Sequence, residues 1–221
     1  MFASFAFIKP PVATLAGSLV FNGTAQSLSI SPGATFGAGA FTVEGWFYNT
    51  SDFNSRAILG VFPTSVAGGL SLYFTNNQTI TSDKNGGLGS FSYTMSTAIT
   101  TNAWHYFIYN RNADGDTTVY IDGVRSTSDV SDTLNYDRAT NTIGRYYSGF
   151  WPGYWTNMRL TIGNAVYDST LLTQSNPTTP LTVLADTKYL MLGAAVTTDS
   201  SGIQTVTNNN GVTQNSALKP F

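Results

Sequence analysis

The stretch 104–123 decides the fold, and it reads WHYFIYNRNADGDTTVYIDG. Residues 104–111 alternate as in a strand, the Asn-Ala-Asp-Gly-Asp cluster at 112–116 turns the chain, and residues 117–122 return. This order predicts a hairpin with a glycine-containing loop, followed by a tight turn at Asp122-Gly123. Side chains of a strand alternate between its two faces, and here both faces are apolar. The two sets are Trp104, Tyr106 and Ile108, and His105, Phe107 and Tyr109. We therefore expect the hairpin to lie centrally in a sheet, covered on both sides.

Working outward, short β-prone runs separated by turn clusters fill the rest of the chain. The expected strands cover residues 18–22, 27–31, 41–49, 57–62, 70–74, 89–95, 141–145, 155–162, 189–192 and 204–207. No long amphipathic helix is indicated, and residues 167–174 are expected to form a loop or one short turn. Many short strands with turn signals between them predict an all-β jelly-roll sandwich of two antiparallel sheets.

The composition limits the classes of function. The chain has 221 residues and a net charge of −2, and only 10% of its residues are charged, against about 25% in typical globular domains. No Lys/Arg run is present to neutralise phosphates, so a nucleic-acid partner is not expected. There is no cysteine, which excludes a thiolate metal site. No apolar run reaches the ~18 residues of a membrane span.

The first residues predict an arm rather than part of a domain. Pro10-Pro11 favours extended backbone, so residues 1–17 are interpreted as an extended N-terminal arm and residues 18–221 as one sandwich domain. The apolar start is not interpreted as a signal peptide, because it has no basic region before it and Lys9-Pro10-Pro11 interrupts it.

Two residues are candidates for catalysis, and neither is well supported. Glu44 is the only glutamate and His105 the only histidine, whereas a retaining glycosidase needs two carboxylates about 5 Å apart. The alternatives are a buried or half-buried strand Glu44 hydrogen-bonded to backbone and a packed, hydrogen-bonded His105 in the core. We therefore expect no enzyme activity and no catalytic residue.

No cofactor is expected, although Asp114, Asp116 and Asp122 are weak calcium candidates because Ca²⁺ binds carboxylate and carbonyl oxygens. The alternative for all three is an ordinary role in β-turns, since the twelve-residue calcium-loop pattern is missing.

The segment 145–155 is the strongest candidate for ligand contact, since it holds six aromatic residues and the loop formers Gly149, Pro152 and Gly153. Aromatic rings bind the apolar faces of sugars while polar groups fix orientation. Asn157 is a further candidate hydrogen-bonding group. Core packing and a protein–protein contact remain alternatives, because Trp, Tyr and Arg are also enriched at interfaces. The candidate residues are Arg145, Tyr146, Tyr147, Trp151, Tyr154 and Trp155.

Three blocks in order resemble the laminin-G-like group of the concanavalin A-like lectin/glucanase fold. The first is SLVFNG at 18–23 with FTVEGW at 41–46. The second is WHY at 104–106 with VYIDG at 119–123. The third is NTIG at 141–144, GY at 153–154 and NMRL at 157–160. The resemblance implies a concanavalin A-like sandwich. It also gives a criterion for glucanase activity, because some enzymes of this fold carry their catalytic carboxylates on one strand as Glu-x-Asp-x-x-Glu. This chain lacks that motif.

The C-terminal part resembles such domains in marine phage and other viral structural proteins. The similar stretches are RLTIGNAVY at 159–167, PTTPL at 177–181, DSSG at 199–202 and KPF at 219–221. This resemblance implies a non-catalytic virion structural protein, a capsid decoration or tail adhesion module. Residues 1–17 would anchor it to other virion proteins, and copies would form a homo-oligomer. The protein would lie on the virion surface and would become extracellular when the host cell lyses. The alternative is a glycan-binding, lectin-like adhesion module for host attachment, and a lower alternative is a glycoside hydrolase.

Overall fold

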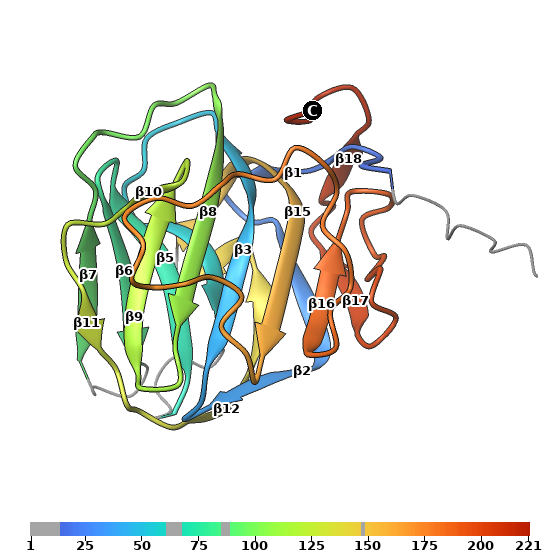
Figure 1. Ribbon diagram of the computed structural model, residues 1–221. Helices are drawn as coiled ribbons and strands as arrows, with labels where there is room; N and C mark the ends of the chain where they lie inside the picture. Colours follow the sequence, from blue (N-terminus) through green and yellow to red (C-terminus); the bar gives the residue numbers. More distant parts are fainter. Residues whose placement is uncertain (1–13, 61–67, 85–88, 147–148) are drawn as a thin grey trace, which may run out of the picture.

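The computed structural model describes residues 14–60, 68–84, 89–146 and 149–221, without the side chains of residues 140 and 141. These residues form two antiparallel sheets packed face to face, as expected (Figure 1). Sheet A has nine strands in the order β10-β9-β8-β3-β15-β1-β18, with β11 on β9 and β16 on β15. Its strands are β1 (Ser18–Asn22), β3 (Phe41–Asn49), β8 (Trp104–Arg111), β9 (Asp116–Ile121), β10 (Val124–Arg125), β11 (Val130–Ser131), β15 (Pro152–Ile162), β16 (Thr187–Met191) and β18 (Thr213–Asn215).

Sheet B has seven strands in the order β17-β2-β12-β4-β5-β6-β7. They are β2 (Ser27–Gly37), β4 (Arg56–Gly60), β5 (Leu70–Asn76), β6 (Thr79–Lys84), β7 (Ser90–Thr94), β12 (Tyr136–Ile143) and β17 (Thr205–Asn209). Two short strands, β13 (Arg145–Tyr146) and β14 (Gly149–Phe150), pair with each other outside both sheets. Strand β6 was not expected, because its sequence TITSDK contains only one large apolar residue.

The core lies between the sheets, and alternation along each strand decides which side chains enter it. In β3, Phe41, Val43 and Phe47 enter the main core, while Glu44 and Trp46 lie on the outer face of sheet A. The hairpin of β8 and β9 is confirmed, and β8 pairs with both β3 and β9. The prediction of a central hairpin is therefore correct, and its strands are buried on both faces except at Trp104 and Asp116, their first residues.

The outer face of sheet A is partly covered by residues 163–185, which we call the strap. The strap follows β15 and crosses sheet A in front of β8 and β9 (Figure 1, orange). Beneath it, Tyr106, Ile108 and Tyr120 are fully buried, and Tyr167 of the strap packs against them. The expected absence of a helix at 167–174 is confirmed. In the described part of the chain no helix is long and apolar enough to span a bilayer.

The predicted arm and the sandwich meet earlier than residue 18. Leu15 is buried with Leu181, Leu190 and Leu192, and the Gly17 carbonyl accepts a hydrogen bond from Thr156 at 2.6 Å. Residues 15–17 therefore pack as part of the domain, while residues 1–13 of the predicted arm lie outside the described residues.

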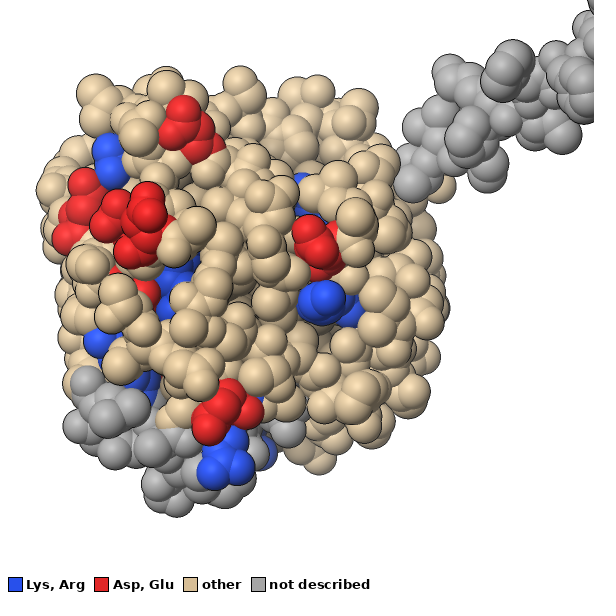
Figure 2. All heavy atoms as spheres, turned by 60° about the horizontal axis from the view of Figure 1, so that its bottom comes forward, with Lys and Arg blue, Asp and Glu red and all other residues tan. Residues whose placement is uncertain are grey.

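Charged groups are sparse on the surface. Figure 2 shows a face on which most atoms belong to uncharged residues, with only scattered acidic and basic groups. This face therefore agrees with the composition, in which only 10% of the residues are charged.

Candidate functional site

The aromatic segment 145–155 does not form one site, because its side chains point in three directions. Trp151 and Trp155 are only 0% and 1% exposed and belong to the main core. Their rings lie 5.1 Å apart and both pack on Phe47. These two candidates therefore have a structural role, which is the core alternative that the sequence left open. Tyr147 lies outside the described residues.

Arg145 and Tyr146 lie on the sheet B side of the molecule. Tyr146 stacks on Tyr73 of β5 with ring centroids 4.2 Å apart, and its hydroxyl donates a 2.6 Å hydrogen bond to Asp83 of β6. Burial, and then the hydrogen bond to Asp83, raises the pKa of Tyr146 well above its usual value. Arg145 lies over the Phe150 ring at 5.5 Å. The expected loop at 145–155 is thus partly wrong, because β13 and β14 pair and β15 begins at Pro152.

Tyr154 lies on the opposite side of the sandwich from Tyr146. It is half-buried on the outer face of sheet A, and its ring centroid is 5.5 Å from that of Tyr48. The segment thus passes from sheet B through the core to sheet A, which separates the predicted ligand residues. Asn157 is fully buried, and its carbonyl oxygen accepts the Leu181 amide hydrogen at 2.8 Å, so it holds the strap rather than a ligand.

The three calcium candidates do not converge. Asp114 and Asp116 lie at the start of β9, in a turn whose amides donate to the Asn112 side chain at 3.0 and 2.9 Å. Asp122 follows the other end of β9, about 17–20 Å away at ~3.3 Å per residue. The described residues contain no group of three or more acidic, histidine or cysteine side chains placed to hold a metal. The three carboxylates therefore do not lie at one common position, and Asp114 and Asp116 lie in the β8–β9 turn.

Glu44 is fully buried and surrounded by hydrogen-bond donors. Its Oε1 accepts from Arg159 Nε at 2.8 Å and Nη2 at 2.6 Å. Its Oε2 accepts from the hydroxyls of Tyr167, at 2.5 Å, and Tyr106. Burial and the negative charge of Glu44 raise the pKa of both tyrosines. The expected burial is correct, but the partners are side chains, not backbone.

His105 is an 8% exposed residue whose two ring nitrogens both have partners. Nδ1 lies 2.5 Å from Asp122 Oδ2, and Nε2 lies 3.0 Å from the Thr100 carbonyl and 3.1 Å from its hydroxyl. The prediction of a packed, hydrogen-bonded His105 is confirmed. The contact also fixes the loop that contains Thr100.

That loop borders a pocket of about 670 Å³ at one end of the sandwich. We call it the rim pocket. It is formed where three connections meet, between β3 and β4, β5 and β6, and β7 and β8, at the top of Figure 1. Its lining residues are Asp52, Phe53, Asn54, Thr75, Asn76, Asn77, Ala98, Ile99, Thr100 and Thr101.

The lining combines hydrogen-bonding groups with a small apolar surface. Asp52, Asn54 and Asn77 are exposed, and Phe53 and Ile99 are buried beneath them at 3% and 5% exposure. Asp52 Oδ1 accepts from Arg56 Nε and Nη2 at 3.0 and 2.6 Å, while no described side chain donates to its Oδ2. The volume is within the usual range for small-molecule sites, and a few placed polar groups over apolar side chains are typical of them.

The three connections are tied to one another by backbone hydrogen bonds. The Ile99 amide donates to the Asn77 carbonyl at 2.7 Å, and the Asn102 amide donates to the Asn49 carbonyl at 2.8 Å. Ser55 and Asn102 adopt positive φ angles of 53° and 58°, a backbone state uncommon for residues other than glycine. These contacts hold the three connections in fixed positions, and a pocket whose walls are held in place lowers the entropic cost of binding.

The sequence interpretation missed the rim pocket, although a signal was present. The clusters SDFNS at 51–55, NNQ at 76–78 and TAITTN at 97–102 each predict no more than a turn when considered alone. In an antiparallel arrangement, alternate connections lie at the same end of the sheets, so the three could have been placed together.

Solved structures with the same fold include a protein described as a putative carbohydrate-binding protein and a domain solved with a bound oligosaccharide. A putative carbohydrate-binding protein from Bacteroides ovatus is 16% identical with a TM-score of 0.64, covering 91% of this chain and 60% of its own. Domain 4 of AbnA, an extracellular arabinanase from Geobacillus stearothermophilus solved with arabinotriose, is 18% identical with a TM-score of 0.52, covering 72% and 78%. Domains LG4-5 of the mouse laminin α1 chain are 15% identical with a TM-score of 0.53, covering 73% and 46%.

The chain thus spans about half of the laminin fragment and 60% of the Bacteroides protein. At these identities the likeness establishes the fold alone. No curated protein matches the chain. Residues 22–162 match the family model described as the concanavalin A-like lectin/glucanases superfamily, and the chain therefore belongs to that superfamily.

Proposed function

We propose that this domain is a carbohydrate-binding module that binds a neutral glycan in the rim pocket. The observation behind the proposal is the pocket lining, in which the carboxylate of Asp52 and the amides of Asn54 and Asn77 surround the buried Phe53 and Ile99. Carboxylate and amide groups hydrogen-bond sugar hydroxyls, and apolar side chains contact the C–H face of a sugar ring. The Bacteroides protein and the arabinanase domain, which share the fold, support a carbohydrate ligand.

The proposed module is non-catalytic. Glu44 is the only glutamate, and its two oxygens are occupied by Arg159, Tyr106 and Tyr167 beneath the strap. A glycosidase acid or nucleophile must reach the scissile bond, and this carboxylate is 0% exposed.

The virion role rests on the C-terminal motifs, the predicted N-terminal arm, the expected lack of a signal peptide and the low proportion of charged residues. The laminin fragment, the Bacteroides protein and the arabinanase domain are not viral. Glycan binding therefore has the stronger support. Glycan binding and a virion location are compatible, because a domain on a viral particle can bind host glycans. The virion location is therefore a separate prediction.

The test is a glycan array probed with the full chain and with two variants of matched chemistry. Asn77→Ala removes an exposed amide from the rim pocket, and Asn164→Ala removes an exposed amide in the strap. We expect a glycan signal that Asn77→Ala reduces by about tenfold, or ~1.4 kcal/mol, and that Asn164→Ala leaves unchanged. An array without signal above background, or equal loss in both variants, would refute the rim pocket as a glycan site.

A further inference from the structure

Three aromatic rings lie side by side on the outer face of sheet A, at the end where the rim pocket opens. Tyr154 of β15 is paired in register with Tyr48 of β3, which is paired with Trp104 of β8. The ring centroids of Tyr48 are 5.5 Å from Tyr154 and 5.6 Å from Trp104. All three residues are half-buried, and we call them the aromatic ledge.

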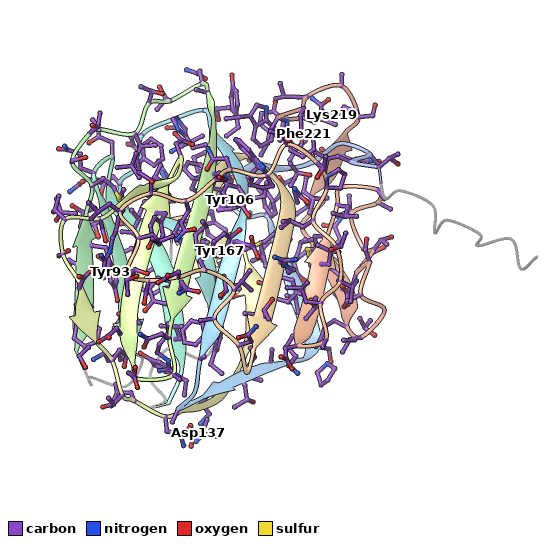
Figure 3. All side chains as sticks on the ribbon, viewed as in Figure 1. Tyr93, Tyr106, Asp137, Tyr167, Lys219 and Phe221 are labelled. Carbon is purple, nitrogen blue, oxygen red and sulfur yellow. The ribbon has the colours of Figure 1, made fainter. Side chains whose placement is uncertain are left out.

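The ledge differs from the other aromatic residues on this face, which the chain itself covers. Tyr106 and Tyr120 are fully buried beneath the strap. Trp46 packs against Tyr106 at 5.2 Å and Phe221 at 6.2 Å; Phe221 and Tyr106 are labelled in Figure 3. The ledge lies one step further along β3 and keeps part of each ring exposed. Contiguous apolar patches on a protein surface, when they are large, mark interaction sites or ligand-binding grooves.

The exposed part of Trp104 is apolar. The indole nitrogen of Trp104 is buried without a hydrogen-bond partner in the described structure, so the accessible part of this side chain is the apolar ring. The rings of Tyr48 and Trp104 are inclined at 66°, and those of Tyr48 and Tyr154 at 85°. The three therefore present faces and edges in different directions rather than one flat stack.

The ledge is continuous with the rim pocket through two short links of backbone. Strand β3 runs from Tyr48 directly into the connection that holds Asp52, and the connection that holds Thr101 runs directly into Trp104. One hydrogen bond joins these links, from the Asn102 amide to the Asn49 carbonyl at 2.8 Å. A second, from the Thr50 amide to the Pro152 carbonyl at 3.1 Å, ties the first link to β15. The ledge and the pocket thus lie on two sides of one rigid rim.

We propose that the ledge is a second subsite for the glycan, and that the ligand is a stretch of polysaccharide several sugar units long that crosses the rim. This inference rests on the proposed function. The pocket binds hydroxyl groups through Asp52, Asn54 and Asn77, whereas the ledge stacks on the apolar C–H faces of the following units. One monosaccharide does not fill two surfaces of opposite character on either side of a rim, so a chain is the ligand that uses both.

The experiment compares binding of oligosaccharides of increasing length by calorimetry. The probes are arabino- and gluco-oligosaccharides of one to six units, titrated into the full chain and into three variants. Tyr154→Ala removes a ledge ring, Tyr154→Phe retains it, and Asn77→Ala alters the pocket. We expect affinity in at least one series to rise about tenfold with length. Tyr154→Ala is expected to abolish that rise without changing binding of the shortest ligand, Tyr154→Phe to keep it, and Asn77→Ala to weaken every length.

The two proposals fail in different ways. Binding that does not depend on length, or a length dependence equal in wild type and Tyr154→Ala, overturns the ledge subsite and leaves the rim pocket standing. No binding at any length overturns both. Sedimentation is measured in parallel: a dimer that Tyr154→Ala dissociates would identify the ledge as a contact between copies and overturn the subsite. Thermal unfolding of each variant confirms that it is folded.

Discussion

Arg159 donates two hydrogen bonds, at 2.8 and 2.6 Å, to the same carboxylate oxygen of Glu44, across 115 residues of sequence. Both residues are buried, at 5% and 0% exposure. The pair joins β15 to β3 on the outer face of sheet A, and Arg159 Nη1 extends it to the Thr182 carbonyl of the strap at 2.8 Å. Tyr106 and Tyr167 complete the shell, from β8 and the strap (Figure 3). The pair therefore fastens the strap to the sheet.

Replacing Glu44 by Gln is expected to lower the free energy of unfolding by about 3 kcal/mol, because removing one partner of a buried ion pair leaves the other charge uncompensated. Urea denaturation measures the change. The double variant Glu44→Leu/Arg159→Met, which removes both charges, should be more stable than Glu44→Gln. A loss below ~1 kcal/mol in Glu44→Gln would show that the pair is not a structural fastening.

This pair also explains what the sequence motifs could and could not predict. The FTVEGW and NMRL motifs contain Glu44 and Arg159, and the order of the three motif blocks to which they belong was sufficient for the fold class. Alternation along 104–109 predicted two apolar faces, and both are buried in the structure, with Phe107 and Tyr109 in the main core and Tyr106 and Ile108 beneath the strap. The sequence alone could not predict the hydrogen-bond partners of Glu44. Arg159 is 115 residues away along the chain, and the contact depends on how β3 and β15 pair.

The aromatic segment shows why composition alone could not place a site. Trp151 and Trp155 are buried, whereas Tyr154 between them faces outward, since neighbouring strand residues alternate. The segment 145–155 was interpreted as a loop, so alternation was not applied and all three residues were assigned to one candidate site. Once β15 is known to begin at Pro152, alternation separates core from surface.

Two substitutions in this segment should have different effects. Trp151→Ala is expected to cost about 3–5 kcal/mol of unfolding free energy, as a large core residue is removed. Tyr154→Ala should cost about 1 kcal/mol, since half-exposed residues contribute less to stability. Denaturation of both variants in urea measures the difference. Equal costs would contradict the assignment of Trp151 to the core and Tyr154 to the surface.

Asp199 is expected to make stability depend on pH in acid. Its burial opposes ionisation, but hydrogen bonds from Leu190 N, the Ser201 side chain and Gln204 N outweigh that effect and lower its pKa. A lowered pKa in the folded state gives stability that is present above the unfolded value, near 3.9, and is lost as the pH falls through the lower folded value. Melting curves below about pH 4 should therefore decline less steeply for Asp199→Asn than for wild type. Parallel declines would contradict this assignment.

Calcium is expected to leave the melting temperature unchanged. Asp114 and Asp116 lie in the β8–β9 turn, whereas Asp122 lies beyond the other end of β9 and accepts hydrogen bonds from His105 and the Tyr106 amide. Differential scanning fluorimetry with excess calcium and with a chelator measures this. If calcium raises the melting temperature and Asp116→Asn removes that increase, the result would contradict this expectation and support a calcium site in the β8–β9 turn.

The central claim, that the rim pocket binds carbohydrate, is tested most directly by locating a bound glycan with amide chemical shifts in solution. The strongest ligand from the array is titrated into uniformly labelled protein. We predict that the largest shifts fall on Asp52–Asn54, Thr75–Asn77 and Ala98–Thr101, the three connections that form the pocket. Shifts confined to another surface, such as the polar hollow lined by Ser29, Asn208 and Asn209, would contradict the account.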